Sequence, residues 1–89
     1  MSIIKDDIIK NICYTKLVYE RINKKLNTDF SKIQIEKFIL KILKETEDNS
    51  ISKIGKNYYI TNIENGIKVT INSNTFRIIT VDKIKSLSR

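Results

Sequence analysis

The chain has 89 residues and a mass of 10.4 kDa, with 17 Lys and Arg against 10 Asp and Glu and no His, which gives a formal charge of +7. This length predicts a single domain, residues 1–89, and no apolar run approaches the roughly 20 residues of a membrane span. One Cys without His excludes a disulfide framework and a standard zinc or haem site, and two Gly exclude the glycine-rich fingerprints for dinucleotides and phosphates. We therefore expect no cofactor and no metal.

The first half of the chain, about residues 1–48, has the periodicity of helices. Apolar residues recur every fourth position over residues 3–12 and 15–26. They are Ile4, Ile8 and Ile12 in the first stretch and Val18, Ile22 and Leu26 in the second. Thr15 is a suitable N-cap for the second stretch, and Asn27 a suitable end because Asn tolerates the left-handed conformation. The pattern fits one bent helix or two.

A third helix is predicted from Ser31 to about Thr46. Ser31 and Gln34 have the spacing of a capping box, in which each side chain bonds the backbone N–H of the other residue. One face of the helix is continuously apolar, while Lys and Glu occupy the opposite face. The apolar positions are Ile35, Phe38, Ile39, Ile42 and Leu43.

After residue 50 the pattern becomes alternating, which is typical of strands. The predicted strands are residues 57–63, 67–72 and 75–81, with a short fourth at 51–54 and a capped C-terminal turn in 83–89. Asn65 and Gly66 indicate a two-residue type I′ hairpin loop, which would place Glu64 opposite Ile67. A tight turn is expected at Ser73 and Asn74. Asp82 is the predicted cap of the final turn.

This register divides the strand residues between two faces. The inner face would hold Ile60, Ile67, Val69, Ile71, Phe76 and Ile78, and the outer face Tyr59, Thr61, Ile63, Lys68, Thr70, Arg77, Ile79 and Val81. We therefore predict an α+β domain with N-terminal helices packed on one face of a three- to four-stranded antiparallel β-meander. Lys68 and Arg77 are expected to be neighbours on the outer face, with Tyr59 close by.

The outer face is the predicted binding surface, because residues 51–89 contain seven basic and two acidic side chains. Docking onto a partner protein is the favoured hypothesis, since Tyr and Arg are common interface anchors. The alternative is nucleic acid, whose phosphates and unpaired bases suit a cationic sheet with an aromatic platform. Codon bias of a low-GC genome is a competing explanation for part of the Lys surplus. The predicted binding residues are Tyr59, Lys68, Arg77, Lys53, Lys56, Thr61 and Thr70, with Tyr19 and Arg21 as secondary candidates.

Two other functional classes fit the sequence less well. Three helices followed by a hairpin also fit a winged-helix DNA-binding domain, but the third helix offers no Arg for guanine recognition. Catalysis is not expected, because Cys13 has no His partner and is interpreted as a small core residue. Tyr19, Glu20 and Arg21 are residue types that a nuclease without His could use, but the side chains of consecutive helical residues point in different directions and do not converge on one substrate.

Four segments resemble a known protein family: residues 11–26, 55–60, 71–73 and 75–82. They are similar to a family of small bacterial proteins, common in low-GC Firmicutes, that is catalogued only as a domain of unknown function. The resemblance implies a cytoplasmic protein encoded by a bacterium or a mobile element, and it supplies no activity or catalytic residues.

In size and composition the chain is also similar to phage-encoded inhibitors, anti-CRISPR proteins among them, although no motif supports this likeness. No signal peptide is expected, because residues 1–5 are followed by Asp6 and Asp7 and not by an apolar segment. We therefore expect a cytoplasmic, non-catalytic binding module that docks onto a protein, for example one that handles nucleic acid. Direct nucleic-acid binding and a homodimer are the alternatives for its partner, and no membrane partner is expected.

Overall fold

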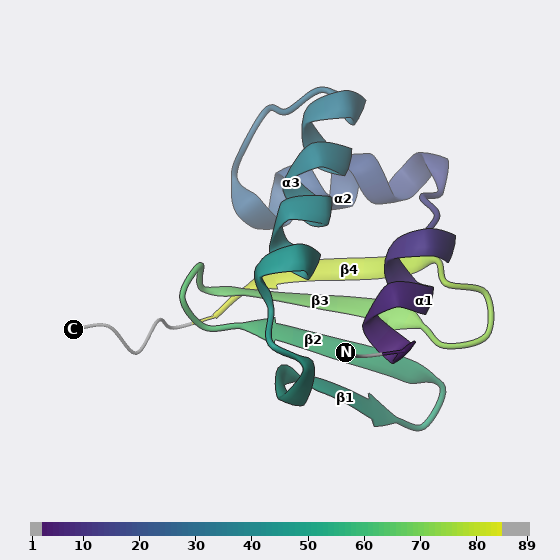
Figure 1. Cartoon of the computed structure of the whole chain (residues 1–89). Coiled ribbons are helices and arrows are strands. Elements are labelled where there is room, and N and C mark those ends of the chain that lie inside the picture. The colour runs from purple at the N-terminus through teal and green to yellow at the C-terminus, as the bar shows by residue number, and fades with distance from the viewer. Residues whose placement is uncertain (1–2, 85–89) are drawn as a thin grey trace.

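The computed structural model describes residues 3–84, which form three helices followed by a four-stranded antiparallel sheet (Figure 1). The elements are α1 (Ile3–Asn11), α2 (Lys16–Leu26), α3 (Lys32–Glu45), the 3-10 turn η1 (Asp48–Ser50), β1 (Ile51–Ile54), β2 (Asn57–Asn62), β3 (Ile67–Asn72) and β4 (Ile78–Lys83). The strands lie in the order β1-β2-β3-β4, and each pairs antiparallel with the next. The predicted α+β meander is confirmed, with its short first strand present.

α1 and α2 are two separate helices joined by an extended segment. In this segment the Cys13 N–H donates to the Phe76 carbonyl at 2.9 Å, and the Ile78 N–H donates to the Cys13 carbonyl at 3.0 Å. Cys13 is exposed, so its assignment to the core was wrong. The backbone pairing places Cys13 at the edge of the sheet, outside the helix face that would have buried it. Ile4 is also exposed, whereas Ile8 is buried as predicted.

The ends of α2 and α3 follow local sequence rules. Thr15 is the N-cap of α2, and Asn27 ends that helix in the left-handed conformation with φ of 57°. At α3, the Gln34 N–H donates to the Ser31 hydroxyl at 3.2 Å and the Ser31 N–H donates to Gln34 Oε1 at 2.8 Å. This reciprocal pair is the predicted capping box.

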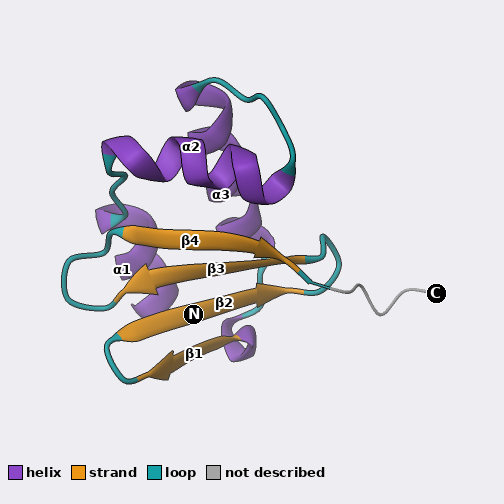
Figure 2. Cartoon of the chain, turned by 180° about the vertical axis from the view of Figure 1, so that it is seen from behind, coloured by secondary structure: helices purple, strands orange, loops and turns teal. Residues whose placement is uncertain are grey.

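The helices and the sheet form two layers around one core. α1 and α3 cover one face of the sheet, and α2 lies alongside β4 (Figures 1 and 2). The core contains Ile8, Val18, Ile22, Leu26, Ile35, Ile39, Ile42, Leu43, Ile60, Ile67, Val69, Ile71, Ile78 and Val81. None of the described helices covers the opposite, outer face of the sheet, which is seen in Figure 2.

The hairpin between β2 and β3 has a longer loop than predicted. Asn62 pairs with Ile67, so the loop contains four residues, 63–66, and the type I′ turn at Asn65 and Gly66 was wrong. The Asn62 side chain explains the difference, because its Oδ1 accepts the Asn65 N–H at 3.0 Å while its Nδ2 donates to Thr46 Oγ1 at 3.1 Å. The register error is two residues, and an even shift leaves every side chain of these strands on its predicted face.

The approach to β4 also differs from the prediction. Asn72 Oδ1 accepts the N–H groups of Asn74 and Thr75 at 2.8 and 2.9 Å, which opens the turn expected at Ser73 and Asn74. Asn72 therefore faces Arg77, its N–H donating to the Arg77 carbonyl at 2.9 Å. Lys68 pairs with Asp82 instead. The predicted proximity of Lys68 and Arg77 was wrong, because the two lie toward opposite ends of the β3–β4 pair.

A bulge in β4 moves one predicted outer residue into the core. Ile71 pairs with Ile78 and Thr70 pairs with Thr80, which leaves Ile79 as the extra residue. An extra residue reverses the alternation beyond it. Val81 is consequently buried, against the prediction.

The end of β4 corrects a second prediction. Asp82 lies within the strand, so it does not cap a final turn, and Lys83 ends the strand. The rest of the predicted C-terminal turn, residues 85–89, lies outside the described part of the chain.

Candidate binding surface

The outer face of the sheet is rich in hydroxyl groups and has one aromatic ring in its middle row. That row crosses all four strands as Ser52, Tyr59, Thr70 and Thr80. A second row holds Thr61, Lys68 and Asp82. The structure thus confirms that Tyr59, Thr61, Lys68 and Thr70 share one face, as predicted. Ile63 does not join them, because it lies in the β2–β3 loop.

Tyr59 and Lys68 form the centre of this face. Lys68 Nζ lies 5.9 Å from the centroid of the Tyr59 ring, within the range of a cation–π contact. Asn57 Nδ2 lies 3.4 Å from the Tyr59 hydroxyl on the other side. Thr70 is only 5% exposed between its neighbours. These contacts restrain the Tyr59 ring on the outer face.

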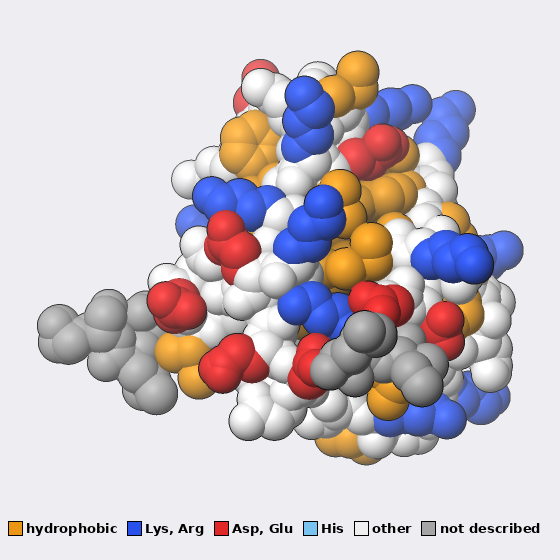
Figure 3. All heavy atoms as spheres, in the orientation of Figure 1, with side chains coloured by type: hydrophobic (Ala, Val, Ile, Leu, Met, Phe, Trp, Pro, Cys, Tyr) orange, Lys and Arg blue, Asp and Glu red, His pale blue; other side chains and the backbone are white. Residues whose placement is uncertain are grey.

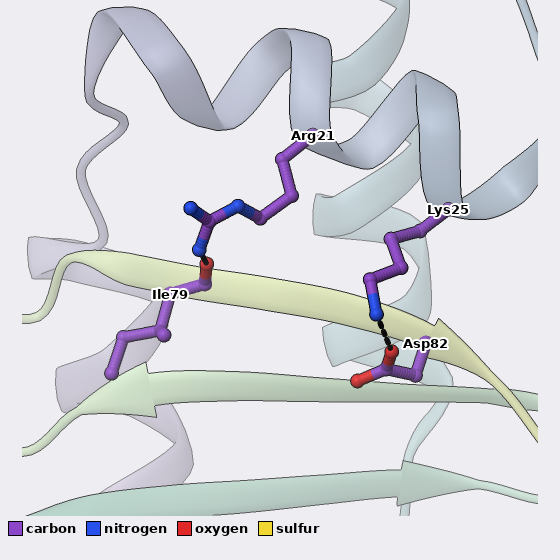
Figure 4. A network of polar contacts seen from close by, with 4 residues as sticks. All are labelled: Arg21, Lys25, Ile79 and Asp82. Carbon is purple, nitrogen blue, oxygen red and sulfur yellow. Dashed lines mark hydrogen bonds and ion pairs between the residues drawn. The ribbon is translucent and has the colours of Figure 1, made fainter.

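Two basic side chains of α2 reach the β4 edge of this face (Figure 4). Lys25 Nζ forms an ion pair with Asp82 at 3.0 Å, and Arg21 Nη1 donates to the Ile79 carbonyl at 3.1 Å. Asp82 is the acidic residue opposite Lys68, and the Lys25 contact offsets its charge. Lys25 and Asp82 were not among the predicted site residues. The ion pair between Lys25 and Asp82 depends on the register of β4, which the sequence did not predict. The four-residue spacing of Arg21 and Lys25 does, however, indicate that both lie on one face of the helix.

Arg77 lies away from Tyr59 and close to α2. Arg77 and Arg21 both line a cavity of about 230 Å³ between the start of α2 and the start of β4. Its other lining residues are Thr15, Leu17, Val18, Ile78 and Ile79. The structure therefore brings together one primary and one secondary candidate that the sequence had assigned to different elements.

Lys53 and Lys56 mark the opposite edge of the sheet. Both are exposed, Lys53 on β1 and Lys56 in the turn between β1 and β2. Ile54 beside them is 66% exposed. Lys53 pairs with Tyr58, an inner-face residue, so its side chain belongs to the inner row at the edge strand. Of the predicted lysines, Lys68 thus lies on the outer face, whereas Lys53 and Lys56 lie at the β1 edge of the sheet.

Comparison with known proteins identifies the family. Residues 6–82 match DUF3781, described as a protein of unknown function. The chain belongs to the DUF3781 family. Neither the comparison with curated proteins nor that with solved structures gave a match. The resemblance predicted from the sequence is confirmed, and a function for this DUF3781 chain has to be argued from its surface.

Tyr19 belongs to a different part of the DUF3781 chain, on the helical side. Its ring stacks on Tyr14 with centroids 5.3 Å apart, and its hydroxyl donates to Glu36 Oε2 at 2.6 Å. This hydrogen bond raises the pKa of Tyr19 to about 12. The pKa of the neighbouring Tyr14 is also raised above its ordinary value, mainly by burial and to a smaller extent by the Glu36 charge. Tyr19 therefore anchors α2 to α3, and it does not join Tyr59.

Residues 3–84 lack two further features, a metal-binding cluster and a membrane-spanning helix. In that range, no three His, Cys, Asp or Glu side chains are grouped so that they could hold a metal ion. None of the described helices combines the length and hydropathy needed to cross a membrane.

Proposed function

We propose that this chain is a non-catalytic binding module that docks onto a partner protein through the outer face of its sheet. The observation behind the proposal is a sheet face that no described helix covers and that has a positioned Tyr59 at its centre (Figure 2). Tyr provides a large contact area at a low entropic cost, and it is enriched at the centres of interfaces.

The composition of the face supports a protein partner. Around Tyr59 stand small hydroxyl and amide side chains: Ser52, Asn57, Thr61, Thr70, Asn72 and Thr80. Such side chains form hydrogen bonds adaptably, and together with Tyr they dominate the binding loops of antibodies. Apart from Lys68, the side chains around Tyr59 are uncharged, and they suit the uncharged polar and aromatic atoms of a protein surface.

The distribution of charge supports a protein over nucleic acid. A nucleic-acid backbone needs several cations along its path, and each phosphate contact adds to the salt dependence of binding. Within the strands, the outer face presents Lys68 opposite the acidic Asp82, whereas Lys53, Lys56 and Arg77 lie near its margins. This arrangement complements a partner with an uncharged central patch and acidic residues around it.

Site-specific photo-crosslinking tests the proposal in the cells that encode the chain. A photoreactive phenylalanine replaces Ser52, which is exposed next to Tyr59, or Ile33, which is 65% exposed on α3. We expect position 52 to crosslink a defined protein that position 33 does not. Adding Tyr59→Ala should lower that product at least about tenfold, the effect of removing an interface anchor. Equal products from both positions, or products insensitive to Tyr59→Ala, would contradict the proposal.

Chromatography on single-stranded DNA and RNA tests the alternative, which is direct binding of nucleic acid. We expect weak retention of the wild-type protein. Lys68→Glu should reduce that retention as much as Lys37→Glu, a control substitution at an exposed lysine on α3. Steep salt-dependent retention that only Lys68→Glu abolishes would show that the outer face binds nucleic acid directly.

A further inference from the structure

The cavity between α2 and β4 contains both arginines that the structure describes. Arg21 reaches it from α2 and Arg77 from the residue before β4. Among residues 3–84, no carboxylate side chain lines this cavity. Two guanidinium groups at one small cavity repel each other, and an anion placed between them would relieve that repulsion.

The side chains of the two arginines are restrained to different degrees, and this difference suits ligand binding. Arg21 is fixed by its hydrogen bond to the Ile79 carbonyl at 3.1 Å (Figure 4), and a guanidinium has further N–H donors to offer. The exposed Arg77 side chain has no hydrogen bond or ion pair to any of residues 3–84. One arginine is therefore preorganised, and the other is free to close on a ligand.

Thr15 adds a hydroxyl to the same cavity. It is the N-cap residue of α2, yet its side chain makes no capping hydrogen bond. A free hydroxyl at this place can donate to an anion. Leu17, Val18, Ile78 and Ile79 supply an apolar wall, and Leu17 is 70% exposed at the surface.

We propose that this cavity binds the oxyanion of a small ligand, a phosphate or a carboxylate carried on an apolar group. The guanidinium fork matches both oxyanions with paired hydrogen bonds. A volume of about 230 Å³ admits the charged group and one small ring. This inference is independent of the docking proposal, because Tyr59 and Lys68 do not line the cavity.

Titrations followed by NMR of the ¹⁵N-labelled protein test the proposal. The probes are inorganic phosphate, phenyl phosphate and benzoate, with benzyl alcohol as the uncharged control. We expect saturable shifts of the Arg21 and Arg77 side-chain N–H signals with the oxyanions and none with the alcohol. Phenyl phosphate should bind more tightly than inorganic phosphate, because its ring contacts the apolar wall. The order of phenyl phosphate and benzoate shows whether a phosphate or a carboxylate is the preferred group.

Variants decide whether the two arginines form the site. Arg77→Gln should weaken phenyl phosphate binding about tenfold or more. Lys53→Gln, an equal loss of charge at the opposite edge of the sheet, should leave it unchanged. Arg77→Lys keeps the charge but loses the fork, and intermediate binding is expected. Absence of saturable shifts, or equal weakening by Arg77→Gln and Lys53→Gln, would overturn the proposal.

Discussion

The two faces of the sheet consist of alternate residues of the same strands, yet they differ in almost every physical property. The inner face is mainly Ile and Val, buried beneath α1 and α3 (Figure 1). The outer face is mainly Tyr, Ser, Thr and Asn, with the charged pair Lys68 and Asp82 and no described helix above it (Figure 2). Since burial of apolar surface is the main driving force of folding, the inner face determines the fold. The outer face contributes less to this burial, and it is the surface that we propose for binding.

The helical side differs from both faces of the sheet in its charge. Figure 3 shows basic and acidic side chains intermixed over α1 and α3, with apolar side chains between them. Residues 51–84, in contrast, contain five basic and two acidic side chains. Mixed charge is typical of a solvated surface, whereas the basic excess favours an acidic partner for the sheet half.

The largest expected effect is on the free energy of unfolding, and it distinguishes the two faces within strand β2. Ile60→Ala removes a fully buried side chain from the inner face, and we expect a loss of about 2–5 kcal/mol of unfolding free energy. Tyr59→Ala, at the next residue but on the outer face, should cost only about 1 kcal/mol. Equilibrium urea denaturation measures both. Equal losses would show that the outer face also belongs to the core.

A smaller loss of unfolding free energy is expected for Asn62, whose amide is buried on the inner face. Asn62→Ala removes the hydrogen bond to Thr46 and the acceptor for the Asn65 N–H, and it should cost about 1–3 kcal/mol. Ser52→Ala, on the outer face, serves as the control and should change stability by less than about 0.5 kcal/mol. The Asn65 and Gly66 amide signals should shift in the first variant. Unchanged signals would mean that Asn62 does not shape the loop.

The ion pair at the edge of the outer face should contribute little. Lys25 and Asp82 are 51% and 31% exposed in their side chains, so water and salt screen their attraction. Asp82→Asn is expected to cost at most about 1 kcal/mol at low salt and less at high salt. Thermal unfolding at two ionic strengths measures this difference. A larger, salt-independent loss would indicate a buried role for Asp82.

The last prediction concerns the helical side, where a pH dependence is expected only under alkaline conditions. The Glu36 hydrogen bond raises the pKa of Tyr19 from 10.0 to about 12, so the folded state favours the neutral phenol. The resulting stabilisation is complete below pH 10 and is lost as the pH rises through about 12. Phenolate absorbance, as the difference between wild type and Tyr19→Phe, gives this pKa. Glu36→Gln should lower it toward 10.0, and an unchanged value would exclude the hydrogen bond as its cause.

Local rules predicted the helices well, because the decisive contacts lie a few residues apart. The capping box of Ser31 and Gln34 is an example. The β2–β3 and β3–β4 hairpins, however, have longer loops than predicted, for one shared reason. Asn62 and Asn72, the last residues of β2 and β3, accept N–H groups of their own loops. Asn62 is also held by Thr46, sixteen residues away, which no local pattern shows.

The candidate surface was predictable to the extent that it depends on alternation alone. Tyr59, Thr61, Lys68 and Thr70 keep their predicted face, because the register of β2 and β3 is shifted by an even number of residues. Arg77 does not join them. Its position depends on the length of the Asn72 loop and on the backbone pairing with Cys13, and the second of these is a long-range feature.

The most direct test of the outer-face proposal compares Tyr59, on the outer face of the sheet, with Ile33, which is exposed on α3. With the crosslinked partner purified, calorimetry gives its affinity for the wild-type protein, Tyr59→Ala and Ile33→Ala. We predict a loss of about tenfold or more for Tyr59→Ala and less than about twofold for Ile33→Ala, with both variants folded. A loss confined to Ile33→Ala would contradict the proposal and place the interface on the helices.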